Sequence, residues 1–227
     1  MAHQVNSEFT GTIENLIFYE REGKYLIRTV QRQAVASQVS AKAFGRASAA
    51  GKILRNHLAP LILNPKDKGM QYRLTTAVQK FLALDQQAEI QAQSNPLAGF
   101  RFAEDSDLQS CLNFTLLISE EPGSGIRVEL PAFNARQSVV APEGTSRMEL
   151  RFLTAVIDAK GNGAVAGTPE VISFPYTDEM RVPLELILTT GQQTGLTVVA
   201  AALSYWNGDR KIVQPGFIPV QIVAAFK

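Results

Sequence analysis

Alternating apolar and polar residues mark the start of the chain as β-structure. In residues 9–31, Tyr25 and Ile27 alternate with Leu26 and Arg28, and the charged turn "EREGK" separates two strand-like runs. The pattern therefore predicts a β-hairpin. Because two strands are only marginally stable in water, we expect this hairpin to pack against a helix, against the C-terminal half or against a neighbouring molecule.

The spacing of apolar residues then changes to that of helices. Ser37 or Ser40 can cap a helix that Pro60 kinks or ends. Small side chains dominate its apolar face and allow another surface to approach closely; the face contains Val39, Ala43, Ala47, Ala50, Leu54 and Leu58. A second helix is expected over residues 71–93, where "SNP" stops it. The two helices are predicted to form a helical hairpin.

From Leu97 onward the pattern is that of strands separated by turns. Seven segments rich in β-branched and aromatic residues alternate with Gly, Pro, Asn and Asp clusters. Alternating strand and helix patterns are not seen, which argues against a parallel α/β sheet. We therefore predict an α+β protein: a β-hairpin with two helices in residues 1–96, and an antiparallel, jelly-roll-like β-sandwich in residues 97–227.

Charge is divided unevenly along the chain, although the net charge is only +1. Residues 24–73 contain ten Lys and Arg against the single acid Asp67, a net charge of +9, whereas residues 74–227 carry −5 and residues 1–23 carry −3. Four of these cations lie largely away from the apolar line of the first helix: Lys42, Arg46, Lys52 and Arg55. Such a segment favours an acidic partner. The partner is either nucleic acid or the β-rich half of another copy, where the candidate acids are Glu120, Glu121, Asp178 and Glu179.

No motif for catalysis or metal binding stands out. His3 lies near the terminus and His57 near a helix end, so neither has the setting of a catalytic base. The cluster of Glu104, Asp105 and Asp107 has the start of a calcium loop but not its Gly and distal Glu. "EEPGSG" and "DAKGNG" are turns and not phosphate loops, because no helix pattern follows either of them. We therefore expect a protein that is not an enzyme and holds no metal or cofactor.

Two other features have possible functional roles: the single cysteine and an aromatic pair at the end of a predicted strand. The single cysteine, Cys111, lies in an apolar run, where it is expected to be a small buried side chain; it can form no intrachain disulfide. Tyr205 and Trp206 end a predicted strand, where they could form the rim of a sugar site. The alternative is that Trp206 closes the end of the core or lies at a subunit contact.

The sequence also bears on localisation. The first residues have no basic segment followed by an apolar one, and no run reaches the ~18 apolar residues of a membrane span. We expect the protein to be synthesised in the cytoplasm. Later incorporation into an extracellular or phage-like assembly is compatible with this expectation.

The N-terminal segment resembles a family of uncharacterised bacterial, partly phage-like proteins. "GTIENLIFYEREGKYLIRT", followed by an Ala-rich basic helix, is similar to the family pattern of Gly-x-x-x-Asn-x-x-Phe-Tyr and Gly-Lys-x-Tyr-x-Arg, with these matching residues: Gly11, Asn15, Phe18, Tyr19, Gly23, Lys24, Tyr25 (one place early) and Arg28. The family's "NPRT"-like segment is replaced here by "RQAVASQVS". The resemblance covers at most the first 60 residues and implies no catalytic residues. It implies a phage-like or surface structural role.

Together these patterns predict a subunit that assembles with itself into a filament, tube or phage-like particle. The hairpin would exchange or add strands between copies, and the basic helix would meet an acidic surface. The expected interface contains Phe9, Ile13, Phe18, Tyr25, Ile27, Ala43, Ala47, Ala50, Lys42, Arg46, Lys52 and Arg55. The alternative is a binding module, either for sugar through Tyr205 and Trp206 or for nucleic acid through the basic helix.

Overall fold

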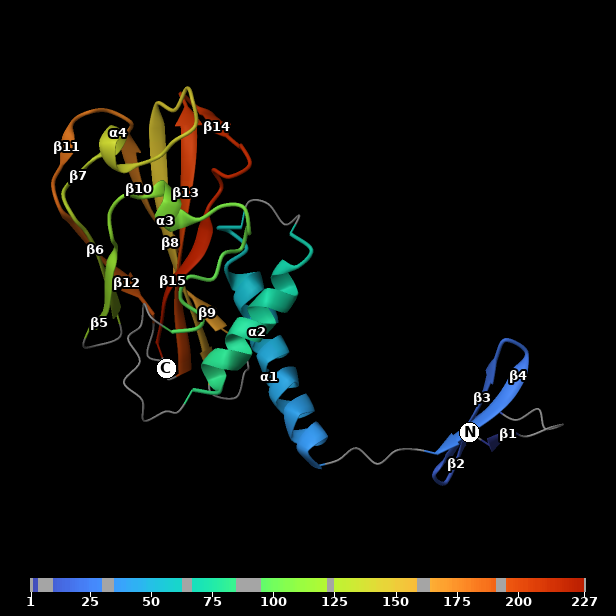
Figure 1. The fold of residues 1–227 in the computed structure, drawn as a ribbon. Coiled ribbons are helices and arrows are strands. Elements are labelled where there is room, and N and C mark those ends of the chain that lie inside the picture. The colour runs from blue at the N-terminus through green and yellow to red at the C-terminus, as the bar shows by residue number, and fades with distance from the viewer. Residues whose placement is uncertain are drawn as a thin grey trace. The chain divides into compact units, whose positions relative to one another are not determined.

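A computed structural model of the chain describes residues 2–3, 10–29, 35–62, 67–84, 95–121, 125–158, 164–190 and 195–226. It divides into two compact units, residues 1–42 and residues 43–227. The predicted α+β class is confirmed: the described residues form mainly antiparallel sheets, with four helices (Figure 1). The two units differ from the division expected at residue 96, because both helices of the predicted helical hairpin pack against the β-rich half.

The first unit is a small antiparallel sheet. The predicted hairpin is confirmed as β3 (Leu16–Arg21) and β4 (Lys24–Thr29). Its turn residues Glu22 and Gly23 have φ of 55° and 71°, as a type I′ hairpin turn requires. Two short strands extend it to the order β1-β4-β3-β2, namely β1 (Ala2–His3) and β2 (Gly11–Ile13).

Helix α1 (Val35–His57) crosses the boundary between the units. It begins before both serines expected to cap it, and it ends before Pro60 in a turn where Leu61 N–H donates to Leu58 O. Helix α2 (Met70–Leu82) starts within one residue of the expected position. It ends earlier than predicted: Phe81 is its last buried side chain, and Ala83 and Leu84 follow outside the helix. Residues 85–93 of the expected helix lie outside the described residues.

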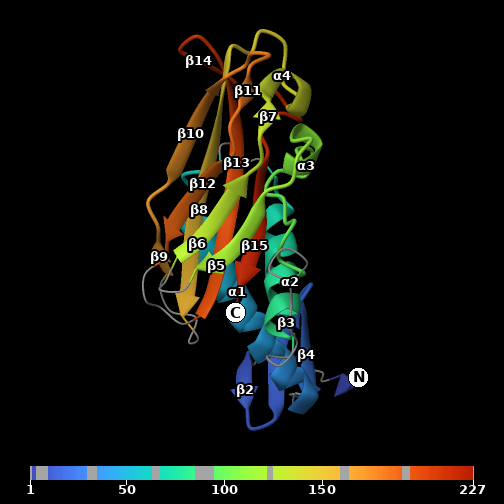
Figure 2. The same cartoon turned by 90° about the vertical axis from the view of Figure 1, so that its left-hand side faces the viewer.

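The second unit contains a main sheet and a small sheet. Their strands pair in antiparallel fashion throughout, and the small sheet lies over one face of the main sheet (Figure 2). The main sheet has the order β10 (Glu170–Pro175), β8 (Arg147–Asp158), β13 (Gly195–Asn207) and β14 (Arg210–Ile212), with β15 (Val220–Phe226) also on β13 and β9 (Ala164–Ala166) on β8. The small sheet has the order β12 (Leu184–Thr189), β6 (Gly125–Leu130) and β5 (Leu117–Glu121).

Short elements complete this unit. Strand β7 (Phe133–Asn134) pairs with β11 (Met180–Arg181), and the helices α3 (Leu108–Cys111) and α4 (Ala135–Ser138) are single turns. Asp107 caps α3, since its Oδ1 accepts from Gln109 N–H at 3.1 Å, and Asn134 caps α4 in the same way through Gln137 N–H.

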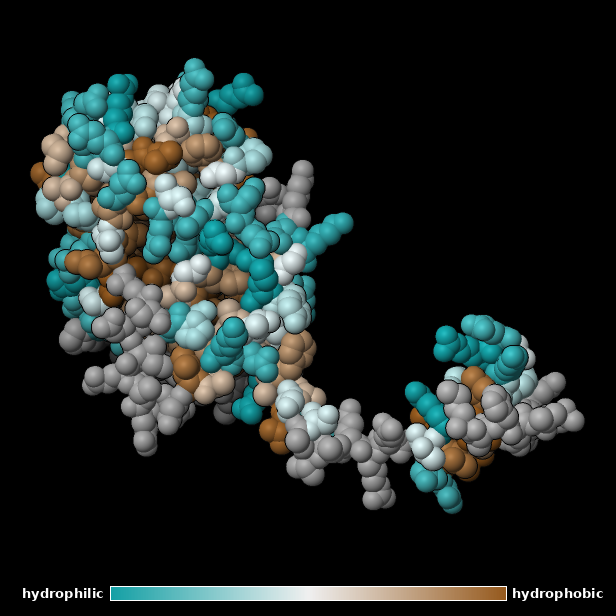
Figure 3. Space-filling model, in the orientation of Figure 1, coloured by the Kyte–Doolittle hydropathy of each residue, from teal (hydrophilic) through white to brown (hydrophobic). Residues whose placement is uncertain are grey.

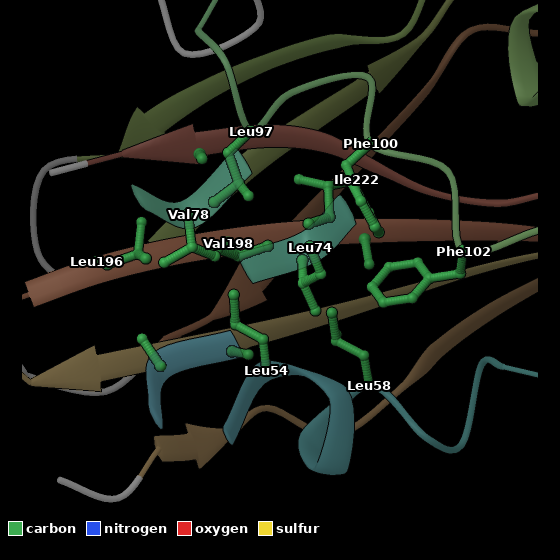
Figure 4. Close-up of a cluster of buried hydrophobic side chains, with 14 of the residues drawn as sticks. Leu54, Leu58, Leu74, Val78, Leu97, Phe100, Phe102, Leu196, Val198 and Ile222 are labelled. Carbon is green, nitrogen blue, oxygen red and sulfur yellow. The ribbon is translucent and has the colours of Figure 1, made fainter. Parts of the chain in front are cut away.

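The main sheet is buried on both faces, which explains the unbroken apolar run of β13. On one face, side chains of α1 and α2 such as Leu54 and Leu74 pack against Val198 and Ile222, as Figure 4 shows. On the other face, Val199 and Leu203 belong to a second cluster shared with the small sheet. A sheet covered on both sides needs apolar residues at successive positions and not at alternate ones.

Candidate functional site

The N-terminal sheet gathers on one face four of the five interface residues predicted in the hairpin segment. Directly paired residues of antiparallel strands share a face, as do alternate residues along a strand. Ile13 pairs with Leu16, Phe18 pairs with Ile27, and Tyr25 lies two residues before Ile27. We call this set the apolar face of the first unit: Ile13, Leu16, Phe18, Tyr25 and Ile27. Phe9, also predicted, lies outside the described residues.

Leu16 was missed by the sequence reasoning, although the alternation of β3 contains the signal. Residues 16 and 18 must share a face in a strand, so the choice of Phe18 also implied Leu16. The cross-strand pairing of Leu16 with Ile13 places it at the centre of the apolar side chains on β2 and β3.

The opposite face of this sheet is mixed and basic. Thr12, Ile17, Tyr19, Leu26 and Arg28 lie on it by the same register. The Arg28 guanidinium lies 5.6 Å from the centre of the Tyr19 ring, a cation–π contact. The register also places Glu20, paired with Tyr25, on the apolar face, so the faces differ chiefly in their balance of apolar and basic side chains.

No described side chain of the first unit is buried. Residues 16–19 and 25–27 are half-buried, residues 37–42 are exposed, and the Ile13 side chain is 60% exposed. Apolar surface on this unit lies beside strongly hydrophilic side chains (Figure 3). The unit thus has an apolar face but no buried core among its described residues.

The small residues of α1 require a correction. Ala47 and Ala50 were expected to face another molecule, but both are buried in the core shared by α1, α2 and the main sheet. The physical reason is close helix packing: a Cβ added at Gly51 would lie 3.7 Å from Thr75 Oγ1 and 3.8 Å from Leu74 Cγ, both on α2. Ala43, one turn earlier, is half-buried.

The basic residues of α1 remain on the surface. Lys42, Arg46 and Lys52 are exposed and Arg55 is half-exposed. No ion pair joins any of these four side chains to another residue in the described part of the chain. Their charge therefore remains available to an acidic partner.

Most of the acids expected to meet them already have partners. Asp178 pairs with Arg136 at 3.4 Å and Glu179 with Arg181 at 3.3 Å. Glu121 pairs with Arg127, and this contact raises the pKa of the Arg127 guanidinium. Of the four named acids, Glu120 is exposed on β5 and makes no ion pair with a described residue. Only one of the four acids predicted to contact the basic helix is therefore without an ion-pair partner among the described residues.

The predicted sugar rim also requires a correction. Tyr205 is fully buried, its hydroxyl donates to Val140 O at 2.9 Å, and its ring packs edge-on against Phe217. Burial raises the pKa of Tyr205 well above its ordinary value. Tyr205 is thus part of the core and cannot form a rim.

Trp206 is half-buried between cations on both neighbouring strands. The Arg147 guanidinium on β8 lies 4.7 Å from its ring centre, and Lys211 Nζ on β14 lies 5.7 Å away. A sugar ring stacks on an open aromatic face, and these contacts occupy the surroundings of the indole. The arrangement therefore gives little support to sugar binding.

Glu149 organises the charges beside this tryptophan. Its carboxylate accepts from Arg147 Nη1 at 2.5 Å and from Arg151 Nη2 at 2.7 Å. Burial acts to raise the pKa of Glu149, but the hydrogen bonds and charges of the two arginines outweigh it, and the pKa lies below its ordinary value. The group is a buried, compensated ion network.

The fold does not gather the other candidate catalytic and metal-binding residues that the structure describes into one site. Asp107 is committed to capping α3, and no three metal-ligating side chains gather among the described residues. Cys111 is buried, and its burial raises the pKa of the thiol. His57 is half-buried at the end of α1, and the side chain of His3 lies outside what the structure describes.

Comparison with protein-family models, with curated proteins and with solved structures finds no match. The resemblance of the N-terminal segment to phage-like proteins accordingly stays a prediction. Across the described helices, none combines the length and the apolar character that a membrane crossing requires.

Proposed function

We propose that this protein is a structural subunit, not an enzyme, which assembles with copies of itself through its N-terminal unit. The observation that carries the proposal is the apolar face of the first unit, on a sheet that buries none of its described side chains. Small sheets become stable when a second surface covers their apolar side. A second copy, which presents the same face, supplies such a surface.

Apolar contact would provide most of the affinity of the assembly. Burial of apolar surface stabilises by about 25 cal/mol per Å². Strand edges of the first unit could add pairing between copies, because an added strand satisfies backbone groups at an open edge. A symmetric contact closes a dimer, whereas a head-to-tail contact continues into a ring or filament.

The exposed cations of α1 would contribute orientation more than affinity. Surface ion pairs are worth about 0–1 kcal/mol each, so Lys42, Arg46 and Lys52 cannot hold copies together by themselves. Opposite charges can still select one orientation of approach. Glu120 on β5 is one acid that another copy would offer.

The finer expectations belong to the same proposal. We propose a jelly-roll-like sandwich for the C-terminal half, which two β-sheets with a shared core support. We also propose a filament, tube or phage-like particle as the assembly. A chain with these properties would present the sandwich as the body of the subunit and the N-terminal unit as its connector.

The proposal is tested by a pair of neighbouring substitutions on β2. Ile13→Glu places a charge on the apolar face, and Thr12→Glu places the same charge on the opposite face of the same strand. Both side chains are exposed, so neither change disturbs a buried core. Light scattering and electron microscopy should show assemblies for the parent and Thr12→Glu, and mainly monomers for Ile13→Glu. A parent protein that is monomeric at every concentration, or two variants that assemble equally, contradicts the proposal.

Nucleic-acid binding is the second candidate, because four cations of α1 lack an ion-pair partner among the described residues. A phosphate grip of this kind weakens steeply with salt. We expect little affinity for DNA or RNA at physiological ionic strength in a gel-shift titration. Tight binding by a monomer, released as salt rises, would favour this candidate over assembly.

A further inference from the structure

A pocket of about 480 Å³ opens on the second unit, and none of its described lining residues belongs to the predicted sites. It lies between α3 and the segment after it on one side, and β15 on the other. Its size falls in the range of about 300–1,000 Å³ that is typical of small-molecule sites. Apolar side chains form much of its wall: Leu108, Leu112, Phe114, Leu116 and Val223.

Hydrogen bonds between distant segments hold the walls of this pocket in place. Gly99 N–H donates to Ile222 O at 2.7 Å, and Ile222 N–H donates to Phe100 O at 2.9 Å, so residues 99–102 lie along the outer edge of β15. On the other side, Asn113 N–H donates to Ser138 O at 2.8 Å, and Val140 N–H donates to Cys111 O at 2.9 Å. A pocket bounded by such contacts is largely formed before a ligand binds.

A β-bulge in β15 shapes the floor of the pocket. Ala200 of β13 pairs with Ile222 and Val199 pairs with Ala224, so Val223 is an extra residue between the two pairs. Gln221 and Val223, on either side of Ile222, both line the pocket. Bulges redirect side chains in this manner and are frequent beside functional sites.

Gln221 supplies a nearly buried polar group to a pocket whose described lining is both polar and apolar. Its side chain is only 4% exposed, and its Oε1 accepts from Leu108 N–H at 3.2 Å. Because Oε1 accepts this bond, the Nε2 end of the amide is the group left to bind a ligand, and it has no hydrogen-bond partner among the described residues. The Nε2 amide is accessible from the pocket and not sealed in the interior, so a ligand acceptor can replace water as its hydrogen-bond partner.

The lack of charged side chains in the described lining restricts the class of ligand further. None of the described residues that line the pocket is charged. An ionised group would lose its hydration there without a compensating charge, which disfavours phosphates and carboxylates. The exposed polar side chains lie near the outside of the pocket: Gln109, Asn113 and Thr115.

We propose that this pocket binds a small neutral molecule with an apolar body and a carbonyl-type acceptor, which Gln221 Nε2 recognises. The apolar body lies against Leu108, Leu112 and Val223, and the acceptor takes the hydrogen bond of the Gln221 Nε2 amide. This binding is separate from the assembly proposed above, because all residues involved belong to the second unit.

Acetanilide is a suitable probe, since it joins a phenyl ring to an amide carbonyl and carries no charge. NMR spectra of the ¹⁵N-labelled full chain should show saturable shifts of the Gln221 side-chain amide. A ligand of this size is expected to bind with a dissociation constant on the order of 1 mM. The absence of a saturable shift up to roughly 10 mM would overturn the proposal.

Variants test the role of the donor. Gln221→Glu keeps an oxygen for Leu108 N–H but removes the Nε2 donor, and it should weaken acetanilide binding at least about tenfold. Gln214→Glu, an exposed position that does not line the pocket, is the matched control and should bind as the parent does. Parent-like binding by Gln221→Glu contradicts the proposal.

A second variant keeps the test valid if Gln221→Glu fails to fold. Ala98 lines the pocket and is half-buried, so Ala98→Leu fills space without removing a hydrogen bond of Gln221. It should also reduce acetanilide binding, and unchanged binding would place the probe elsewhere. Light scattering of both variants should match the parent, which separates this proposal from the one on assembly.

Discussion

At the scale of single residues, Glu149 has the most distinctive environment. Met148, Leu150 and Phe152 alternate with it along β8 and are buried. Glu149 is also nearly buried, with its side chain 10% exposed between Arg147 and Arg151. A buried carboxylate is tolerated here because two guanidinium groups compensate its charge.

The lowered pKa of Glu149 predicts how stability depends on pH. A carboxyl whose pKa is lower in the folded than in the unfolded state contributes stability above the unfolded pKa, and this contribution is lost as pH falls through the folded pKa. Urea unfolding should therefore show a loss of stability below about pH 4.3, the ordinary value for Glu. Glu149→Gln should lose about 1.5–3 kcal/mol at pH 7 and show a flatter pH profile.

The control for this prediction is Glu143→Gln, at an exposed turn position that makes no ion pair with a described residue. It should leave both the stability at pH 7 and the acid slope close to those of the parent. If Glu149→Gln and Glu143→Gln behave alike, the network around Glu149 does not stabilise the fold.

At the scale of elements, the packing of α1 on α2 depends on small side chains. Ala47 and Ala50 are buried, and Gly51 brings the helix backbone close to Leu74 and Thr75. The sequence pattern identified this face correctly as a contact surface but assigned it to another molecule. The difference arises because periodicity reports that a face is buried without reporting what buries it.

Ala47→Leu should destabilise the second unit by about 1–3 kcal/mol, because the extra methyl groups have no space between α1 and its neighbours. Ala49→Leu makes the same change at an exposed position of the same helix and should alter stability by less than about 0.5 kcal/mol. Thermal unfolding of the two variants measures the difference. Equal melting temperatures would mean that the face of α1 at Ala47 is not packed.

At the scale of the whole molecule, the two units have different degrees of burial. The buried core of the second unit begins at Ala47, whereas no described side chain before residue 43 is buried. The boundary at residues 42 and 43 therefore coincides with the start of the hydrophobic core and not with the end of a helix. Such a chain can lose its first unit without loss of the interior of the second.

Removal of residues 1–34 should leave the second unit folded and abolish assembly. The remaining chain keeps α1 from Val35 and all residues of both buried clusters. We expect a melting temperature within about 4 °C of the parent, equivalent to a stability change below roughly 1 kcal/mol, and a monomer by light scattering. If the shortened protein still assembles, the assembly interface lies on the second unit and the prediction is wrong.

Local patterns in the sequence determined the elements and the character of their faces. The alternation around Glu22 and Gly23 determined the hairpin, and Gly23 suits one of the two positive-φ positions of its type I′ turn, whereas Glu22 is a residue that seldom adopts the other. The apolar spacing around Leu54 and Leu74 determined two helices. These features depend on residues a few positions apart, so they can be read without knowledge of the rest of the chain.

Contacts between distant residues decided everything else. Tertiary structure placed α1 and α2 on the main sheet, which turned Ala47 from an expected interface residue into a core residue and left the cations of α1 exposed. It buried Tyr205 against Val140, and it formed the pocket at Gln221 from segments more than a hundred residues apart, as the bond from Leu108 illustrates. Periodicity cannot contain this information, because burial depends on which surfaces meet, and that choice is made by packing across the whole chain.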